Sequence, residues 1–511
     1  MGALLLGIDV GTASTKGVLL RPDGSTVAEA RVDHGMDIPR PGWAEQDADA
    51  IWWADVVAIC RRLVAAVRPG DALAGIGCSA IGPTLVHVDA GVRPLRPAIL
   101  YGVDTRATTQ IAALEARHGK ADLTAFSGHA LSSQAVGPKI VWIREQQPDV
   151  DRAARWLLTA SSYLGLRLTA ELAIDVHTAS HWNPLFDTTA LAWSTRYADG
   201  ITGLERLPRI GWPVERLGGV SARAAAETGL PEGLPVALGT VDVQAEAVSV
   251  GVVEPGDLMV MYGSTTFLIL VTDRPVAADP LWLVAGAEPG TRALAAGLAT
   301  GGSALAWFRD RFAPDLVAAE DGGGRNAFAA LAAEAAVDPV DAGAGATPVV
   351  LPSFSGERTP VNDPLARGVI AGLSLRSTRG DVYRGLVDGI ALAVRANVEA
   401  MRALGMPIRR AVAVGGGTAD ASLMQAVSDA TGLAQDVPEA TVGAARGDAF
   451  LAGRAAGLLT PADLAGWVRH AGFVEPDAGR AAMMSDRAEL AGELFASTRD
   501  VVHRLAETES G

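Results

Sequence analysis

Five residues near the start of the chain have types and spacing suited to binding a phosphorylated ligand. An apolar run ends at Asp9, and Gly11, Thr12, Ser14 and Lys16 follow shortly after it. Glycine permits close backbone approach, while successive N–H groups, hydroxyls and an ammonium are donors for phosphate oxygens. A carboxylate ending an apolar strand is costly without a cation, and Mg²⁺ beside a nucleotide would supply one. These residues predict a phosphate-binding turn, with a solvated hairpin loop as the alternative.

A second carboxylate follows another short apolar segment. Residues 236–238 have the pattern of a strand, and Asp242 comes between that strand and a helix of small residues. Asp242 is either a reacting acid or only the cap of that helix. Soon afterwards, VMYGSTTFLILVTD repeats the opening order of apolar strand, polar turn and apolar strand. Hairpins at 7–20 and 259–272 therefore predict a duplicated sheet core, with the two turns facing each other across a cleft.

Two glycine-rich turns each join a strand to a helix. Gly301 and Gly302 open one of these helices, where helix N–H groups favour an anion. The run 415–417 has the same arrangement but differs from a GxGxxG dinucleotide fingerprint. A dehydrogenase is therefore not predicted, and a serine hydrolase lacks its G-x-S-x-G elbow.

The elements that position these residues alternate between strands and helices. Asp47 or Asp49 is expected to cap an early helix, and a long helix is expected over 381–404. Lys139 opens another helix and could equally be surface charge. His177 and His181 are four residues apart, but without a third ligand a zinc site is not favoured.

Size and composition restrict the class of protein. A chain of 511 residues exceeds the size of a single core, so at least two domains are expected. A net charge of -15 argues against a general nucleic-acid or anionic-membrane binder. Two cysteines are too few for a disulfide framework, so the cytoplasm is the expected compartment. The MGALLLGID start lacks the features of a signal peptide, and no apolar run is long enough to span a bilayer.

Taken together, these motifs resemble the FGGY family of carbohydrate kinases, in the superfamily of actin, Hsp70 and hexokinase. The resemblance runs nearly end to end and in the family's order. It is carried by GIDVGTASTKGVLL, WAEQD, PAILYGVDTRA, PKIVWIREQQP, GLPVALGTVDVQ, YGSTT, TGGSALAWFRD, FSGERTPVNDPLARGVIAGL, GDVYRGLVDGIALA, GGGTADASLMQ and GAARGDAFLAG.

The resemblance implies an α/β fold of two ribonuclease H-like domains. Each domain would have a mixed five-stranded sheet, with a ligand cleft between them. The expected boundaries are 1–246 for the sugar-binding domain, 247–455 for the nucleotide-binding domain, and 456–511 for a helical segment packed on the second domain. Dimers are common among such kinases, although the residues themselves do not demonstrate a homodimer.

The resemblance also implies roles for individual residues in ATP-dependent phosphorylation of a sugar or polyol hydroxyl. Asp242 would be the general base, and Asp9 and Asp242 would hold Mg²⁺. The implied ATP-binding residues are Gly11, Thr12, Ser14, Lys16, Gly263, Ser264, Thr265, Gly301, Gly302, Gly415, Gly416 and Gly417. The implied substrate-binding residues are Gln46, Gly82, Pro83, Asp104, Arg106 and Gln244.

The identity of the sugar depends on residues 81–84. Glycerol kinases carry an Arg-Glu pair there and typical xylulose kinases a Met-His pair, whereas this chain has Gly82 and Pro83. The branch that resembles xylulose kinases makes a ketopentose such as D-xylulose the first expectation, with ribulose, another ketose or a pentitol as alternatives. An actin-like or Hsp70-like ATPase switch and a sugar-binding module without activity are the rivals. The presence of both Asp9 and Asp242 argues against the inactive module.

Overall fold

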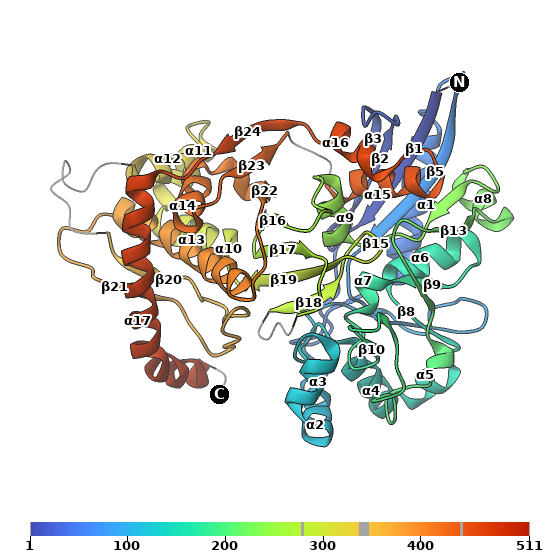
Figure 1. Ribbon diagram of the computed structural model, residues 1–511, viewed down its shortest axis with the longest axis horizontal. Coiled ribbons are helices and arrows are strands. Elements are labelled where there is room, and N and C mark those ends of the chain that lie inside the picture. The colour runs from blue at the N-terminus through green and yellow to red at the C-terminus, as the bar shows by residue number, and fades with distance from the viewer. Residues whose placement is uncertain (1, 277–280, 337–346, 440–442, 510–511) are drawn as a thin grey trace. The chain divides into compact units, whose positions relative to one another are not determined.

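The computed structural model describes residues 2–276, 281–336, 347–439 and 443–509 (Figure 1). They form two compact units. The first consists of Met1–Pro255, Val271–Ala293 and Ala440–Arg469, and the second of Gly256–Leu270, Leu294–Glu439 and His470–Gly511. The boundaries expected from the sequence divide the chain into consecutive parts, whereas each of these units is made of three separate ranges. The expected boundaries therefore stay a prediction.

The first unit is organised around a mixed sheet with the strand order β13-β14-β5-β1-β2-β3. Strands β1 to β3 are antiparallel, while β5 runs parallel to β1, and β14 and β15 run parallel to β5. The strands are β1 (Gly2–Val10), β2 (Ser14–Leu20), β3 (Thr26–Asp33), β5 (Asp71–Ala80), β13 (Arg216–Gly219), β14 (Pro235–Ala237) and β15 (Thr240–Val241). The predicted hairpin at 7–20 is therefore confirmed.

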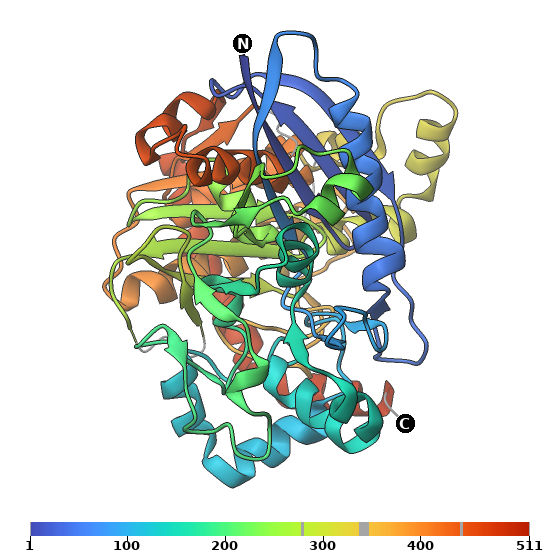
Figure 2. The ribbon, with the colours of Figure 1, turned by 90° about the vertical axis from the view of Figure 1, so that its right-hand side faces the viewer.

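Strand β1 is buried on both faces, as its continuous apolar run predicts. Leu6 and Ile8 belong to one core cluster with Ile59 of α1 (Ala54–Val64), and Leu5 belongs to another with Phe450 of α15 (Ala444–Ala455). Figure 2 shows α1 lying along the blue strands β1 to β3. Asp47 caps the preceding π-helix η1 (Ala48–Trp53), as expected, by accepting from the N–H groups of residues 49 and 50.

Glycines on β1 and β5 allow α15 to approach the sheet backbone. A Cβ on Gly7 would lie 1.9 Å from the carbonyl oxygen of Ala445, and one on Gly77 would lie 2.2 Å from that of Asp448. No larger residue fits at either position without displacing the helix. This contact explains why α15, late in the sequence, belongs to the first unit.

The remaining elements of the first unit surround this sheet. They include a second core of helices α2 to α5. The helices are α2 (Thr108–His118), α3 (Lys120–Ser127), α4 (Val136–Gln146), α5 (Pro148–Ala153), α6 (Ala160–Thr169), α7 (Val176–Ala179), α8 (Ala222–Thr228), α9 (Asp242–Ser249) and α16 (Leu464–Trp467). Short strand pairs are β4 (Glu45–Gln46) with β7 (Ala98–Ile99), β6 (Val86–Val88) with β8 (Trp156–Leu158), β9 (Ala173–Asp175) with β12 (Arg209–Gly211), and β10 (Phe186–Asp187) with β11 (Ala192–Trp193).

The second unit repeats the plan with the strand order β19-β17-β16-β22-β23-β24. Its strands are β16 (Asp257–Tyr262), β17 (Thr266–Thr272), β19 (Arg292–Leu298), β22 (Arg410–Val414), β23 (Gln435–Pro438) and β24 (His470–Val474), with β20 (Val349–Leu351) and β21 (Val369–Ala371) as a separate pair. Its helices are α10 (Gly302–Phe312), α11 (Pro314–Asp321), α12 (Ala327–Ala335), α13 (Arg379–Ala403), α14 (Ala421–Thr431) and α17 (Ala478–Glu509). The predicted second hairpin and the long helix, here α13, are confirmed.

Two sequence expectations require correction. The expected number of five strands in each sheet is too low. Short strands extend the sheets, namely β13 and β15 in the first unit and β24 in the second. The C-terminal segment that was expected to be helical also contains a strand, β24, which pairs with β23. Edge pairing of this kind is a long-range choice that helical periodicity does not reveal. In the described part of the chain, no helix combines the length and apolarity required to cross a membrane.

The Gly7 contact generates a stability prediction. Replacing Gly7→Ala forces the β1 backbone and α15 apart, and we expect a loss of about 1–3 kcal/mol in the free energy of unfolding. Urea denaturation would measure it. Gly466→Ala in α16 is the control, because a Cβ there meets no atom within 4 Å. Equal stabilities for the two variants would contradict the close-packing argument.

Candidate active site

Strand register places Asp9 beside Lys16 and Ser79. Asp9 pairs with Lys16 across β1 and β2, and with Ser79 across β1 and β5. Paired residues on neighbouring strands point to the same face of a sheet. The Ser79 hydroxyl lies 3.2 Å from Asp9 Oδ1. Burial raises the pKa of Asp9 to about 6, although Lys16 and the Ser79 hydrogen bond lower it.

Asp242 extends the same row of side chains. Thr240 of β15 pairs with Ser79, and Asp242 follows as the first residue of α9. Its Oδ1 accepts the N–H of Val243 at 2.7 Å. Burial raises the pKa of Asp242 to about 8, and the nearby charge of Asp9 contributes. The interpretation of Asp242 as only a helix cap is wrong, because Val241 occupies the N-cap position.

Two further acids join this cluster, and sequence reasoning missed both. Glu246 lies one helical turn after Asp242, and burial together with Asp9 raises its pKa to about 7. Asp448 of α15 is fully buried, and its Oδ2 lies 2.6 Å from the Ser79 hydroxyl. Burial raises the pKa of Asp448, and Asp9 adds to the effect. The four-residue spacing of Asp242 and Glu246 was the available signal for one, whereas Asp448 depends on long-range packing.

The turn between β1 and β2 together with the first two residues of β2, residues 11–15, is here called the first phosphate loop. The carbonyl groups of residues 11–13 are bonded to groups outside the loop. Gly11 O accepts from His34 Nε2 at 2.9 Å, Thr12 O from Gln46 Nε2 at 3.0 Å, and Ala13 O from the His34 N–H at 3.0 Å. Among the described residues, the N–H groups of Thr12 and Ala13 have no acceptor. N–H groups left open on a turn are suited to an anion.

Gln46 has internal partners for its polar atoms. Its side chain is fully buried, its Nε2 donates to Thr12 O and Gly35 O, and its Oε1 accepts from Trp52 Nε1 at 2.9 Å. These contacts make Gln46 a support of the first phosphate loop. Its assignment as a substrate-binding residue stays a prediction.

Asp104 and Arg106 are engaged in the same way. Asp104 accepts from the Ala44 N–H at 2.8 Å and from Arg106, whose side chain has no exposed surface. Arg106 also donates to Glu45 at 2.7 Å and lies 4.2 Å from the centre of the Trp43 ring. The pair therefore forms a buried charge network, and direct contact of either residue with a sugar stays a prediction.

Three of the sequence-predicted substrate residues lie close to Asp242. A Cβ on Gly82 would come within 2.9 Å of the Val241 side chain, and Pro83 is the next residue. Gln244 follows Asp242 on α9 and is almost fully buried. Its Oε1 has no hydrogen-bond partner within the described part of the chain. An unpartnered buried amide oxygen is costly, so a ligand hydroxyl would stabilise it.

Lys139 is buried, which excludes the interpretation as surface charge. Its Nζ donates to the carbonyls of Leu100 and Tyr101 at 2.6 and 3.1 Å. Burial lowers the pKa of Lys139 to about 7, partly offset by Asp104. The Tyr101 hydroxyl lies 3.3 Å from Thr12 Oγ1, so Lys139 holds a segment that reaches the first phosphate loop.

The His177 and His181 pair serves the core. His177 Nδ1 donates to the Ala285 carbonyl at 2.6 Å, and the two rings lie 5.7 Å apart. In the portion of the chain that the structure describes, no three His, Cys, Asp or Glu side chains are placed to hold a metal ion. A zinc site at this pair therefore has no support.

The second predicted phosphate turn, between β16 and β17, is tied to the start of α10. The N–H groups of Gly301 and Ser303 donate to Ser264 O at 3.0 Å, and that of Gly302 donates to Gly263 O at 2.9 Å. Gly301 and Gly302 were expected to offer their N–H groups to an anion. In the structure these groups hold the turn instead.

A cavity of about 910 Å³ adjoins this turn within the second unit. Of the predicted ATP-binding residues, Gly263, Ser264, Gly302, Gly416 and Gly417 line it, while the walls come from α12 and the start of α14. The other lining residues are Tyr262, Leu305, Arg325, Asn326, Phe328, Ala329, Ala332, Ala333, Ala419, Asp420, Ala421 and Ser422. Gly415 lies behind it with φ 93°, where a Cβ would meet Tyr262 O at 2.6 Å.

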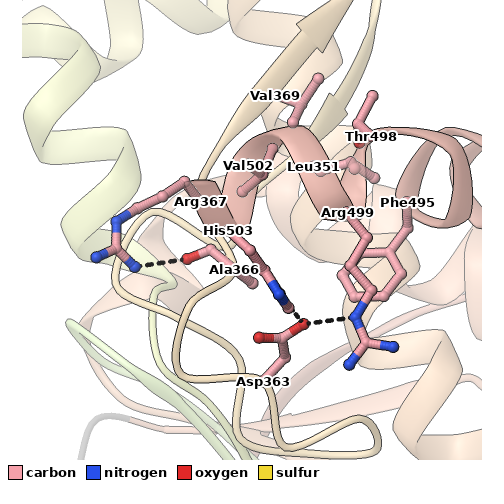
Figure 3. Close-up of a pocket in the computed structure, with 10 residues that line it drawn as sticks. All are labelled: Leu351, Asp363, Ala366, Arg367, Val369, Phe495, Thr498, Arg499, Val502 and His503. Carbon is pink, nitrogen blue, oxygen red and sulfur yellow. Dashed lines mark hydrogen bonds and ion pairs between the residues drawn. The ribbon is translucent and has the colours of Figure 1, made fainter. Parts of the chain in front are cut away.

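A smaller pocket in the second unit lies under α17 (Figure 3). Asp363 accepts from His503 at 2.8 Å and from Arg499 at 3.2 Å, and both donors come from α17. Phe495 and Val502 cover the apolar side. None of the predicted site residues lines this pocket. The hydrogen bonds of Asp363 to His503 and Arg499 attach α17 to the segment between β20 and β21.

Comparisons with known proteins show the family and the fold. Residues 4–249 match the N-terminal domain and residues 258–456 the C-terminal domain of the FGGY family of carbohydrate kinases. Xylulose kinase of Escherichia coli (strain K12) is 29% identical over 457 residues, covering 88% of this chain and 89% of that protein. Glycerol kinase of Nocardia farcinica (strain IFM 10152) is 29% identical over 474 residues, covering 89% and 91%. The solved structure of xylulose kinase from Rhodospirillum rubrum has a TM-score of 0.90 at 30% identity, covering 98% of this chain and 100% of that one.

The carboxylate cluster generates a pH prediction. The pKa values of Asp9, Glu246 and Asp242 in the folded protein, about 6, 7 and 8, lie above the values of about 4 expected in the unfolded chain. The folded protein therefore holds more protons than the unfolded chain between these values, and its stability falls as the pH rises through them.

We expect the melting temperature in EDTA to fall between about pH 5 and pH 8. The fall should be smaller for Asp242→Asn, which cannot ionise. Differential scanning fluorimetry across this range would measure both. Superimposable pH profiles for the two proteins would contradict the assigned ionisation.

Proposed function

Because this chain belongs to the FGGY family of carbohydrate kinases, it is an ATP-dependent sugar phosphotransferase, and we propose that Asp242 is its general base. The supporting observation is the environment of Asp242, where burial and Asp9 raise the pKa to about 8. A general base works best with a pKa near the operating pH. While Oδ1 accepts from Val243, Oδ2 would take the hydroxyl proton as the sugar oxygen attacks the terminal phosphorus of ATP and ADP leaves.

Asp9 and Asp242 would hold Mg²⁺ in this proposal. Their carboxylate oxygens are ligands that Mg²⁺ prefers, and it usually takes one or two carboxylates together with waters and phosphate oxygens. The buried Asp448 Oδ1 has no hydrogen-bond partner among the described residues, and its pKa is raised by burial, so a cation beside the cluster would favour the ionised form of these carboxyl groups. When bound, the ion would neutralise charge on the phosphates during transfer.

The first phosphate loop would bind the transferred phosphate. Its proposed donors are the open N–H groups of Thr12 and Ala13 and the Ser14 hydroxyl, with the Lys16 ammonium just after the loop. The rest of the nucleotide would bind the cavity of the second unit, through Gly263 to Thr265 and the glycines at 302, 416 and 417. Gly301 and Gly415 would act by shaping the turns.

The proposed substrate is a ketopentose such as D-xylulose. Xylulose kinases of Escherichia coli and Rhodospirillum rubrum are among the relatives, which supports this choice. Segment 81–84 lacks the Arg-Glu pair of glycerol kinases, which disfavours glycerol. Gln244, Gly82 and Pro83 would contact the sugar, with Gln46, Asp104 and Arg106 as the layer behind them. Ribulose, a hexulose or a pentitol is the alternative.

The role of Asp242 predicts a selective loss of transfer. Asp242→Asn removes the proton acceptor and keeps the side-chain size, so kcat should fall by about 10²–10⁴. The dissociation constant of ADP, measured by calorimetry, should stay within about twofold of that of the unchanged protein. The adenine and ribose of ADP take no part in the transfer of the hydroxyl proton. Asp149→Asn, an exposed change on α5, is the control. Near-normal turnover of Asp242→Asn would overturn the assignment.

The substrate proposal predicts a ranking of sugars. Coupled release of ADP should be measured with Mg-ATP and D-xylulose, D-ribulose, D-fructose, xylitol or glycerol. We expect D-xylulose to give the highest kcat/KM and glycerol the lowest, because the site lacks the charged pair that would bind glycerol. A higher value for a hexulose or a pentitol would move the assignment to that sugar. If glycerol ranked first, the argument from segment 81–84 would be wrong.

A further inference from the structure

We propose that His34, acting with Asp55, is a positioning residue for the first phosphate loop. The inference rests on the proposed function, because it concerns how the loop is held for the transferred phosphate. His34 is the first residue after β3, and Asp55 lies in the first turn of α1. Their side chains are only 7% and 11% exposed.

His34 contacts the loop through its main chain and its side chain. Its N–H donates to Ala13 O at 3.0 Å, and its Nε2 lies 2.9 Å from Gly11 O. Its Nδ1 lies 2.7 Å from Asp55 Oδ2, and the same oxygen accepts from the Thr15 hydroxyl at 2.8 Å. The contacts form a closed path from Gly11 through His34 and Asp55 back to Thr15, so both ends of the loop are held.

The number of protons on His34 and Asp55 determines which groups donate hydrogen bonds and which accept them. Both ring nitrogens of His34 face acceptors, and a neutral imidazole has only one N–H. The pair must therefore hold one proton on Nε2, toward Gly11, and a second between Nδ1 and Asp55. Hydrogen bonds assisted by charge are shorter and stronger than neutral ones. His34 is thus a fixed donor toward the loop carbonyl.

Fixing the carbonyls determines where the loop N–H groups point. Because Gly11 O is bonded to His34, the peptide group that carries Gly11 O and the Thr12 N–H has little freedom to rotate, and this N–H stays open. The next peptide group, which carries the Ala13 N–H, is held by Gln46 through Thr12 O. Preorganised donors stabilise developing charge without reorganisation during the reaction. Loss of the Gly11 bond would free the first peptide of the loop to turn its carbonyl toward the phosphate.

Another histidine–aspartate pair of the chain lacks this connection. His470 and Asp436 lie 2.6 Å apart in the second unit, and neither belongs to the predicted nucleotide site. Removing that pair tests the loss of a histidine–aspartate bond in general. His34 differs because its second nitrogen reaches a loop carbonyl.

Three variants of His34 separate its two bonds. His34→Gln places an amide nitrogen near the position of Nε2 and keeps a donor for Gly11, whereas His34→Asn places one near Nδ1 and keeps only Asp55. His34→Ala removes both bonds, and His470→Ala is the control. Each protein is assayed for kcat and KM with the sugar that the unchanged enzyme phosphorylates. Melting temperature is measured with MgADP alone and with MgADP plus aluminium fluoride, which imitates the transferred phosphoryl group.

We expect kcat to fall about tenfold in His34→Ala and His34→Asn and to stay within about threefold in His34→Gln. The KM for the sugar and the shift in melting temperature with MgADP should not change. The additional shift with aluminium fluoride should disappear in the first two variants and persist in His34→Gln and His470→Ala. A merely structural role would lower the melting temperature without removing this additional shift.

Two results would overturn the inference in an active enzyme. One is an unchanged aluminium fluoride shift in His34→Ala, and the other is equal loss in His34→Gln and His34→Ala, which would remove the role of the Gly11 bond. If the unchanged protein phosphorylated no sugar and showed no fluoride shift, the proposed function itself would fail and the inference with it.

Discussion

Crowding of carboxylates around Asp9 is the constraint on which the first unit depends. Four acids interact near the carboxyl end of the central strand β1: Asp9 on that strand, Asp242 and Glu246 on α9, and Asp448 on α15. Burial raises the pKa of each. Lys16 offsets this effect for Asp9 and Glu246, but one ammonium does not balance four acids. Such a cluster persists only where strand register and helix packing hold the acids in place, because an unbalanced buried charge otherwise favours unfolding.

Backbone packing brings the most distant of these acids into place. Gly7 and Gly77 let α15 approach β1 and β5 so closely that no space remains for a Cβ atom, and Asp448 thereby reaches Ser79. A helix late in the sequence thus completes a site that begins at the ninth residue. Small residues at a helix–sheet contact have a functional consequence here, since a wider separation would remove Asp448 from the hydrogen bond to Ser79.

Local pattern was sufficient for part of the fold and site. Both hairpins and the positions of Asp9 and Asp242 follow from apolar runs interrupted by polar turns, signals contained within about twenty residues. Asp448 and the bond from His34 to Asp55 join segments that are far apart in sequence, so no local period reveals them. Short edge strands such as β24 were missed for the same reason. Gln46 and Asp104 show a different limit: residue type indicated a polar role, but their internal partners depend on the folded environment.

These internal partners affect where sugar specificity can reside. The Gln46 amide donates to the first phosphate loop, and the Arg106 guanidinium donates to buried carboxylates. The Lys139 ammonium donates to a carbonyl of the segment before Asp104. Side chains with satisfied hydrogen bonds gain little from a ligand, whereas an unpartnered buried group gains a full hydrogen bond. Gln244 Oε1, without a partner among the described residues, is such a group, two residues after Asp242 on α9. Under the proposed function, a sugar hydroxyl would therefore gain more from Gln244 than from the satisfied network of Asp104 and Arg106.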